Sequence, residues 1–161
     1  MMGAPRRMRN MVVEEGSEVL SVRHPVKELD AEEADEFIRL TQTALASREV
    51  EESLSKGSSV YAGIRVGSRL VSAGRGLILR GIGGILLSIK TEEPFRHRGY
   101  GTSLVSYLTG RVLLKGRFST LFVEEDNLPA IHVYKKTGYR EEGSVFMCSA
   151  SRMNKVPRSL G

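Results

Sequence analysis

A short glycine-rich loop in the middle of the chain carries the residues best suited to binding a phosphate group. The loop consists of Arg96, His97, Arg98, Gly99, Tyr100, Gly101 and Thr102. Glycines let the backbone approach a ligand closely, and free N–H groups at the start of a helix attract anions. The two arginines can add charge-assisted hydrogen bonds. This spacing predicts an anion-binding loop, and a glycine-rich turn flanked by solvated arginines is the competing interpretation.

Two widespread phosphate motifs do not fit this loop. A P-loop ends in Gly-Lys-Ser/Thr, whereas Gly101 is followed by Thr102 and Ser103. A dinucleotide-binding fingerprint needs a third glycine where Leu104 stands, and a parallel β-α-β unit around it. Antiparallel hairpins are predicted before this loop instead, so the sequence favours another class of phosphate site.

Two motifs taken together resemble the GNAT superfamily of acetyl-CoA-dependent N-acetyltransferases. The first is R-x-x-G-x-G over residues 96–101, after an apolar strand that ends at Thr91. The second is N-x-x-A-x-x-x-Y-x-x-x-G-Y over residues 127–139, with Tyr139 where the family more often has Phe. The order and separation of the motifs also fit, and the resemblance covers about residues 84–146.

The resemblance implies where acetyl-CoA binds. In the family, the strand before the loop splays from its neighbour, and the pantetheine arm fills the gap. The residues implied in cofactor binding are Ile89, Lys90, Thr91, Arg96, His97, Arg98, Gly99, Tyr100, Gly101, Thr102, Asn127, Ala130 and Tyr134. The backbone of residues 97–102 would hold the pyrophosphate, and the Tyr134 hydroxyl would lie near the thioester sulfur. A phenol can donate to a departing thiolate, although a core tyrosine is the alternative interpretation of Tyr134.

The general base is less well defined. A substrate amine is mostly protonated at neutral pH and must lose a proton before it attacks. Glu92 and Glu93 follow the strand directly and are the candidates, acting directly or through water, with two solvated loop carboxylates as the alternative. The family often has Pro at the position of Glu93, and here Pro94 follows instead. The catalytic candidates are therefore Tyr134, Glu92 and Glu93, and no metal is required.

The elements that must position these residues form a mixed α/β (α+β) pattern. Strands are predicted over residues 18–23, 60–65, 70–79, 84–91, 120–123 and 139–148, and helices over residues 30–45, 47–56, 99–115 and 127–137. Asp30 and Glu33 have the spacing of a capping box, and Asn127 is a predicted N-cap. The order predicts a mostly antiparallel central sheet flanked by helices, with one crossover. The resemblance implies that the strands are splayed at the cofactor site.

Composition limits the remaining possibilities. The 161 residues suit one domain, predicted over residues 18–150, with a loose N-terminal tail over residues 1–17 and a C-terminal tail over residues 151–161. A single cysteine excludes an intrachain disulfide. The absence of a long apolar run argues against a membrane span, and a cytoplasmic location follows by default. The net charge of +5 permits nucleic acid as a partner, but the basic residues are not interleaved with aromatic ones.

The sequence therefore predicts an N-acetyltransferase that moves the acetyl group of acetyl-CoA onto a primary amine by direct attack in a ternary complex. The amine belongs to a small molecule or a protein, and the sequence is compatible with a homodimer. A non-catalytic acyl-CoA-binding or sensing module is the alternative.

Overall fold

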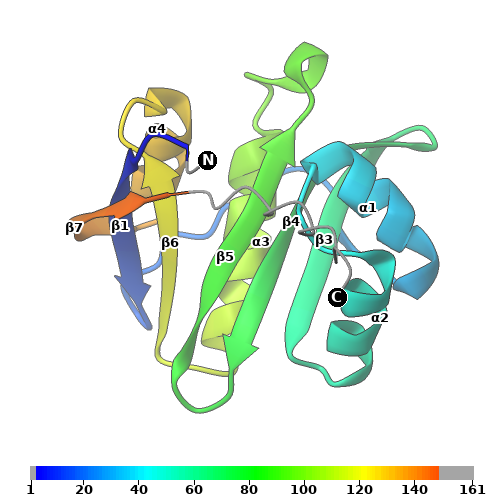
Figure 1. Ribbon diagram of the computed structural model, residues 1–161, viewed down its shortest axis with the longest axis horizontal. Helices are drawn as coiled ribbons and strands as arrows, with labels where there is room; N and C mark the ends of the chain where they lie inside the picture. Colours follow the sequence, from blue (N-terminus) through cyan, green and yellow to red (C-terminus); the bar gives the residue numbers. More distant parts are fainter. Residues whose placement is uncertain (1–2, 149–161) are drawn as a thin grey trace, which may run out of the picture.

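Seven strands form one sheet in a computed structural model that describes residues 3–148 (Figure 1). The strand order is β2-β3-β4-β5-β6-β1-β7, and only β5 and β6 run parallel. The strands are β1 (Arg6–Glu14), β2 (Lys27–Glu28), β3 (Ser59–Val66), β4 (Arg69–Leu79), β5 (Gly83–Thr91), β6 (Phe118–Glu124) and β7 (Arg140–Met147). The predicted mixed fold with a mostly antiparallel sheet is confirmed.

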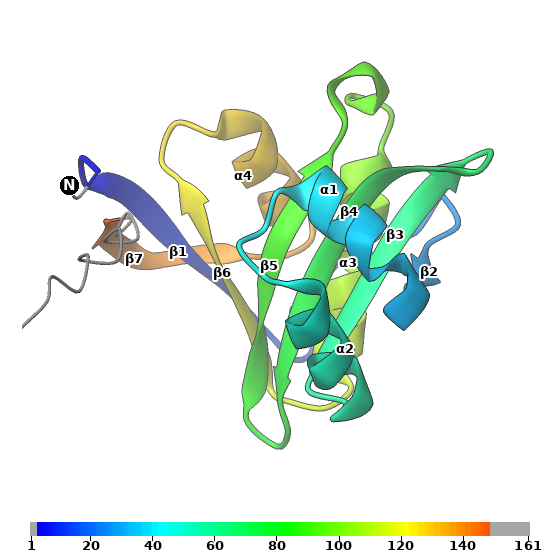
Figure 2. The same cartoon turned by 45° about the vertical axis from the view of Figure 1, so that its right-hand side comes forward.

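Helices cover the two faces of the sheet unequally. They are η1 (Ala31–Glu33), α1 (Ala34–Thr41), α2 (Ser47–Ser55), η2 (Glu93–Phe95), α3 (Tyr100–Leu113) and α4 (Leu128–Lys136). Figures 1 and 2 show α1 and α2 on one face, over β3 and β4, while α3 and α4 lie on the other face. The described elements therefore leave the first face of β6, β1 and β7 without a covering helix.

Helix α3 packs closely on the middle of the sheet. Leu104, Leu108 and Val112 recur at helical spacing, and all three side chains are fully buried. Glycine on β5 makes the close approach possible, because a Cβ at Gly84 would collide with Val112 and with a backbone carbonyl of β4. This packing places the N-terminus of α3 at the end of β5.

Local signals in the sequence predicted most element boundaries well. The three strands predicted over residues 60–91 are present as β3, β4 and β5. Asp30 accepts from the Glu32 amide, and the Glu33 carboxylate accepts from the Asp30 amide, as a capping box requires. Asn127 caps α4 by accepting from the Ala130 amide at 3.3 Å.

The prediction of a loose tail over residues 1–17 is wrong for residues 6–14. These residues form β1, which lies between β6 and β7 and pairs with both of them. Met11 and Val13 on this strand are fully buried. A segment this basic resembles a solvated tail in isolation, and both of its strand partners lie more than 100 residues away in the sequence. The predicted tail over residues 151–161 lies outside the described residues.

The strand predicted over residues 18–23 is also absent. This segment belongs to a connection, residues 15–26, that crosses the α3 face from β1 to β2; we call it the strap. Within residues 18–23, Ser21 N–H donates to Ser106 Oγ of α3 at 3.1 Å, and Val19 N–H donates to the carbonyl of Thr137, the C-cap of α4, at 2.9 Å. The prediction failed because β1 and β2 lie in different halves of the sheet, so the chain between them has no strand to pair with.

Candidate functional site

The first turn of α3 presents a run of backbone donors. Gly99 is the N-cap, with φ of +85° and no side-chain cap, and His97 also has a positive φ of +62°. The first helical bond runs from the Ser103 amide to the Gly99 carbonyl at 3.1 Å. Within residues 3–148, the amides of residues 97–102 donate to no acceptor. Donors that converge on a helix N-terminus form a binding site for an anion.

The two arginines of this loop are arranged by local contacts. Arg96 Nε donates to the Thr91 carbonyl at 3.0 Å, which closes the loop onto the end of β5. The Arg98 guanidinium lies over the Phe95 ring at 5.6 Å from its centroid. Neither arginine forms an ion pair with a described carboxylate, so both add positive charge beside the free amides.

Strands β5 and β6 part beside this loop. They pair only at Gly84 with Ser119 and at Ile85 with Thr120. From residue 86 onward, β5 pairs with β4 alone, and Figure 2 shows β6 diverging from it toward α4. The predicted splay is confirmed. The open edge of β5 leads directly to the first turn of α3.

A β-bulge interrupts β5 within the parted region. The β4–β5 register shifts between Ala73 and Arg75, whose partners are Lys90 and Leu87. Ser88 lies inside the bulge with φ of +54°, an uncommon conformation for a residue other than glycine. A bulge re-aims the backbone and is frequent beside functional sites. β5 itself has no glycine or proline at this point, although Gly74 lies opposite the bulge on β4.

Tyr134 and Tyr139 stand side by side behind the parted strands but have different partners. Their ring centroids are 6.0 Å apart. The Tyr139 hydroxyl bonds to Thr109 Oγ1 at 2.8 Å and to Ser119 Oγ at 2.7 Å. The Tyr134 hydroxyl bonds to no group in the described part of the chain. Burial, with a smaller contribution from Tyr139, raises the pKa of Tyr134 to about 12, so its phenol is protonated at neutral pH.

The two sequence motifs meet in one core cluster. Tyr134 belongs to the same buried cluster as the α3 stripe, and Ile89, Tyr100 and Ala130 pack against that cluster. Asn127 is occupied in capping α4, which orients the first turn of that helix. The fold therefore brings Tyr134, the end of β5 and the start of α3 to one region.

The remaining residues at the end of β5 are held by polar contacts. Lys90 Nζ donates to Gln42 Oε1 at 3.2 Å, and the hydroxyls of Thr91 and Ser72 are 2.8 Å apart. Glu92 forms an ion pair with Arg69 at 2.5 Å, a partner that no sequence pattern suggested. Glu93 is exposed, and its side chain bonds to no group among residues 3–148. The two candidate bases therefore differ, because one carboxylate is already engaged and the other is free.

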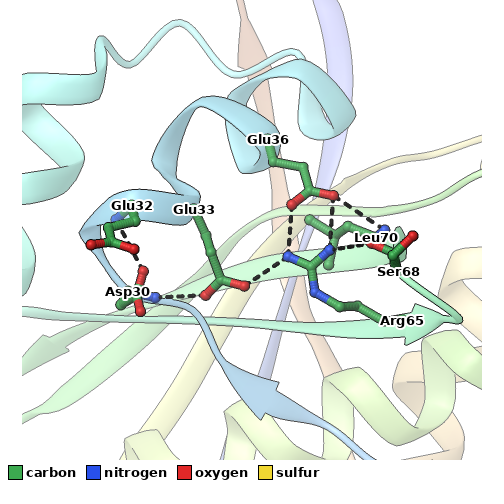
Figure 3. A network of polar contacts seen from close by, with 7 residues as sticks. All are labelled: Asp30, Glu32, Glu33, Glu36, Arg65, Ser68 and Leu70. Atoms are coloured by element: carbon green, nitrogen blue, oxygen red, sulfur yellow. Dashed lines mark hydrogen bonds and ion pairs between the residues drawn. The ribbon is translucent and has the colours of Figure 1, made fainter.

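Helix α1, which brings Gln42 to β5, is anchored by a charged network (Figure 3). Arg65 donates to Glu36 through both terminal nitrogens, at 2.9 and 2.6 Å, and to Glu33 at 2.7 Å. Hydrogen bonds from Arg65 lower the pKa of Glu36, and the two carboxylates raise that of Arg65. Glu36 also accepts from the Leu70 amide at 3.3 Å. The network ties α1 to the β3–β4 hairpin and so fixes the α1 end beside Lys90.

Residues 3–148 contain neither a membrane-spanning helix nor a cluster of metal ligands. None of their helices has the length and apolar character needed to cross a membrane. Their His, Cys, Asp and Glu residues form no group of three or more that could hold a metal ion.

Comparison with known protein families identifies the family to which this chain belongs. The profile of the family described as FR47-like protein matches residues 61–147, which is more than half of the chain. The chain belongs to the FR47-like family, within the GNAT superfamily. This confirms the resemblance found in the sequence, since the match contains both motifs. No curated protein matches the chain.

Solved structures share the FR47-like fold at low sequence identity. A GNAT-family protein from Novosphingobium aromaticivorans has a TM-score of 0.73 at 15% identity over 91% of this chain and 64% of its own. A GCN5-related N-acetyltransferase from Kribbella flavida has a TM-score of 0.67 at 13% identity, over 94% of this chain and 60% of its own. A Clostridium acetobutylicum protein determined with acetyl-CoA has a TM-score of 0.59 at 11% identity, over 82% of this chain and 94% of its own. The chain thus spans less than two thirds of the length of the first two.

Proposed function

We propose that this FR47-like protein binds acetyl-CoA and transfers the acetyl group to a primary amine. The run of free amides over residues 97–102, beside the parting of β5 and β6, carries this proposal. A diphosphate has negative charge and several acceptor oxygens, to which these free N–H groups can donate. The Clostridium acetobutylicum structure, which contains acetyl-CoA on a similar fold, supports the same assignment.

The parted strands fit a long, narrow group. Backbone groups of Ile89 and Thr91, with Lys90 between them, would hold the pantetheine arm along the open edge of β5, while Asn127 and Ala130 on α4 would form the opposite side. The bulge at Ser88 interrupts the ladder with β4 on the other edge of β5 and so changes the course of this strand. When bound, acetyl-CoA supplies an acetyl thioester, which an amine can attack directly if both are held in line.

Tyr134 would act as a hydrogen-bond donor to the leaving sulfur. Its pKa of about 12 lies above that of an ordinary thiol, near ~8.5, so full transfer of its proton is uphill. Donation of a hydrogen bond to a developing thiolate has no such cost and stabilises the charge. The unbonded hydroxyl of Tyr134 suits this role, whereas that of Tyr139 is already engaged.

Glu93 is the better candidate for removing the amine proton, directly or through water. The Glu92 carboxylate is held by the Arg69 guanidinium at 2.5 Å. Glu93 carries no such partner among the described residues and lies where β5 leaves the sheet. A general base must have a lone pair directed at the proton it accepts, and an ion-paired carboxylate has fewer available.

The second candidate is a module that binds acyl-CoA without catalysis. It is favoured by the engagement of Glu92, because one of only two carboxylates at the end of β5 is not free to act as a base.

Calorimetric titration with coenzyme A, followed by a transfer assay with acetyl-CoA and a panel of primary amines, tests both candidates. Binding with transfer to at least one amine is the expected result. Binding with no transfer to any amine supports the binding module. If coenzyme A produces neither heat nor a thermal shift, the proposed cofactor is wrong.

A further inference from the structure

We propose that His24, from the strap, is a positioning residue for the diphosphate-binding turn. The strap is the connection from β1 to β2 and lies outside both sequence motifs. His24 Nε2 lies 2.8 Å from the Arg98 carbonyl oxygen. Because a carbonyl oxygen only accepts, this contact is a hydrogen bond in the tautomer that carries its proton on Nε2. The inference rests on the proposed function, since it concerns the site for coenzyme A.

The peptide group between Arg98 and Gly99 explains why this bond matters. In a trans peptide, the carbonyl of one residue and the N–H of the next point in opposite directions. The described chain contains no cis peptide bond. Holding the Arg98 carbonyl toward the strap therefore directs the Gly99 N–H away from it, among the free donors of the turn. His97 and Gly99, on either side of Arg98, have positive φ angles of 62° and 85°. Glycine adopts such an angle freely, whereas the uncommon conformation of His97 needs contacts to hold it.

Packing adds to the hydrogen bond. The His24 ring lies on Tyr100, with centroids 4.4 Å apart, and a Cβ at Gly99 would touch His24 Nε2 at 3.5 Å. The imidazole therefore fills the space directly behind the turn, on the side opposite the proposed ligand.

The strap itself is fixed to α3 at this point. The amides of Arg23 and His24 both donate to Ser103 Oγ, at 3.1 and 3.2 Å. Ser103 is 1% exposed, and its own amide makes the first helical bond of α3. One buried hydroxyl thus holds the strap backbone while the adjacent imidazole holds the loop backbone, so His24 is placed on a rigid support.

The test uses the full-length protein and two variants at this position. His24→Phe keeps a ring on Tyr100 but removes the donor, and His24→Gln restores an N–H donor. We expect His24→Phe to weaken coenzyme A binding about three- to tenfold, the value of one net hydrogen bond. The same variant should raise KM for acetyl-CoA with little change in kcat, because the bond serves ground state and transition state alike. His24→Gln should recover most of the affinity.

His132→Phe is the matched control, because His132 is an exposed histidine on α4. It should bind coenzyme A like the wild type. Unchanged affinity in His24→Phe would overturn the inference. So would a parallel loss of kcat and melting temperature, which indicates general disruption instead of positioning.

A measurement without ligand separates this inference from the proposed function. In amide correlation spectra of the free protein, His24→Phe should shift the Gly99 N–H signal, and His24→Gln should return it toward the wild-type position. If wild type binds no coenzyme A, the proposed function fails, and the Gly99 signal alone then decides whether His24 holds this peptide. An unmoved Gly99 signal overturns the inference in either case.

Discussion

The two ends of the β5–β6 junction differ in how completely their polar groups are satisfied. At the closed end, the strands pair at Gly84–Ser119 and Ile85–Thr120, and the Tyr139 hydroxyl bonds to two buried side chains. At the open end, the amides of residues 97–102 and the Tyr134 hydroxyl bond to nothing in residues 3–148.

Exposure accounts for the free amides at the open end, but it does not explain the difference between the two tyrosines. Tyr134 and Tyr139 are 8% and 3% exposed, and burial raises the pKa of both to about 12. The amides of residues 97–99 lie on exposed residues, where water can bond to them, and the Tyr134 hydroxyl has no partner among the described residues, so both are available to a ligand. The closed end therefore contributes to stability, and the open end offers free donors to the ligand that we propose.

The largest expected effect comes from placing a negative charge at the open end. A Cβ at Gly101 has room, since its nearest neighbour would be Thr91 Oγ1 at 3.9 Å. Gly101→Glu should weaken coenzyme A binding about 100-fold or more, because like charges in contact cost several kcal/mol. The melting temperature should hold or rise, since a carboxylate suits a helix N-terminus. Gly101→Ala is the control and should bind normally. If both variants bound coenzyme A normally, the turn would not be part of the coenzyme A site.

Removing the free hydroxyl should affect turnover more than stability. Tyr134→Phe is expected to lower kcat about 10- to 100-fold, the value of a hydrogen bond to a charged group, with little change in coenzyme A affinity. The free energy of unfolding should change little, because the hydroxyl has no partner among the described residues. Steady-state kinetics and a denaturant titration measure the two quantities. An unchanged kcat would indicate that Tyr134 serves only as a core residue.

High pH should destabilise the protein through both tyrosines. Their pKa values are near 12 when folded and near ~10 when unfolded, so the unfolded state loses its phenol protons first as pH rises. Stability from these groups is therefore complete below about pH 10 and is lost between about pH 10 and 12, by about 2 kcal/mol for each tyrosine. Denaturant titrations across this range should show a shallower decline in Tyr134→Phe and in Tyr139→Phe. If the free energy of unfolding of a variant fell with pH as steeply as that of the wild type, the tyrosine it lacks would have an ordinary pKa in the folded protein.

The smallest expected effect lies at the closed end and concerns stability alone. Tyr139→Phe leaves the hydroxyls of Thr109 and Ser119 without their shared partner, at a cost of about 1–2 kcal/mol. The kcat should stay within about twofold of wild type when assayed well below the melting temperature. A large loss of kcat would show that the two ends are not separate.

The sequence predicted what depends on short-range chemistry. The loop over residues 96–102 lies at a helix start because Gly99 permits the left-handed cap and the apolar stripe begins at Leu104. The caps at Asp30 and Asn127 also follow from residues within four positions of each other. Together the two motifs predicted the family, and the parting of β5 from β6 came from the resemblance.

Only the tertiary structure decided what depends on distant partners. β1 is a strand because β6 and β7 complete its hydrogen bonds, and its own basic residues suggested a tail. The positions of His24, Arg69 and Ser88 depend on how distant segments of the chain cross and on the register of the paired strands. No local sequence pattern predicts either. The sequence thus predicted which groups form the candidate site, because neighbours in the chain set backbone conformation. The fold decided which of those groups remain free, because hydrogen-bond partners are assigned by long-range packing.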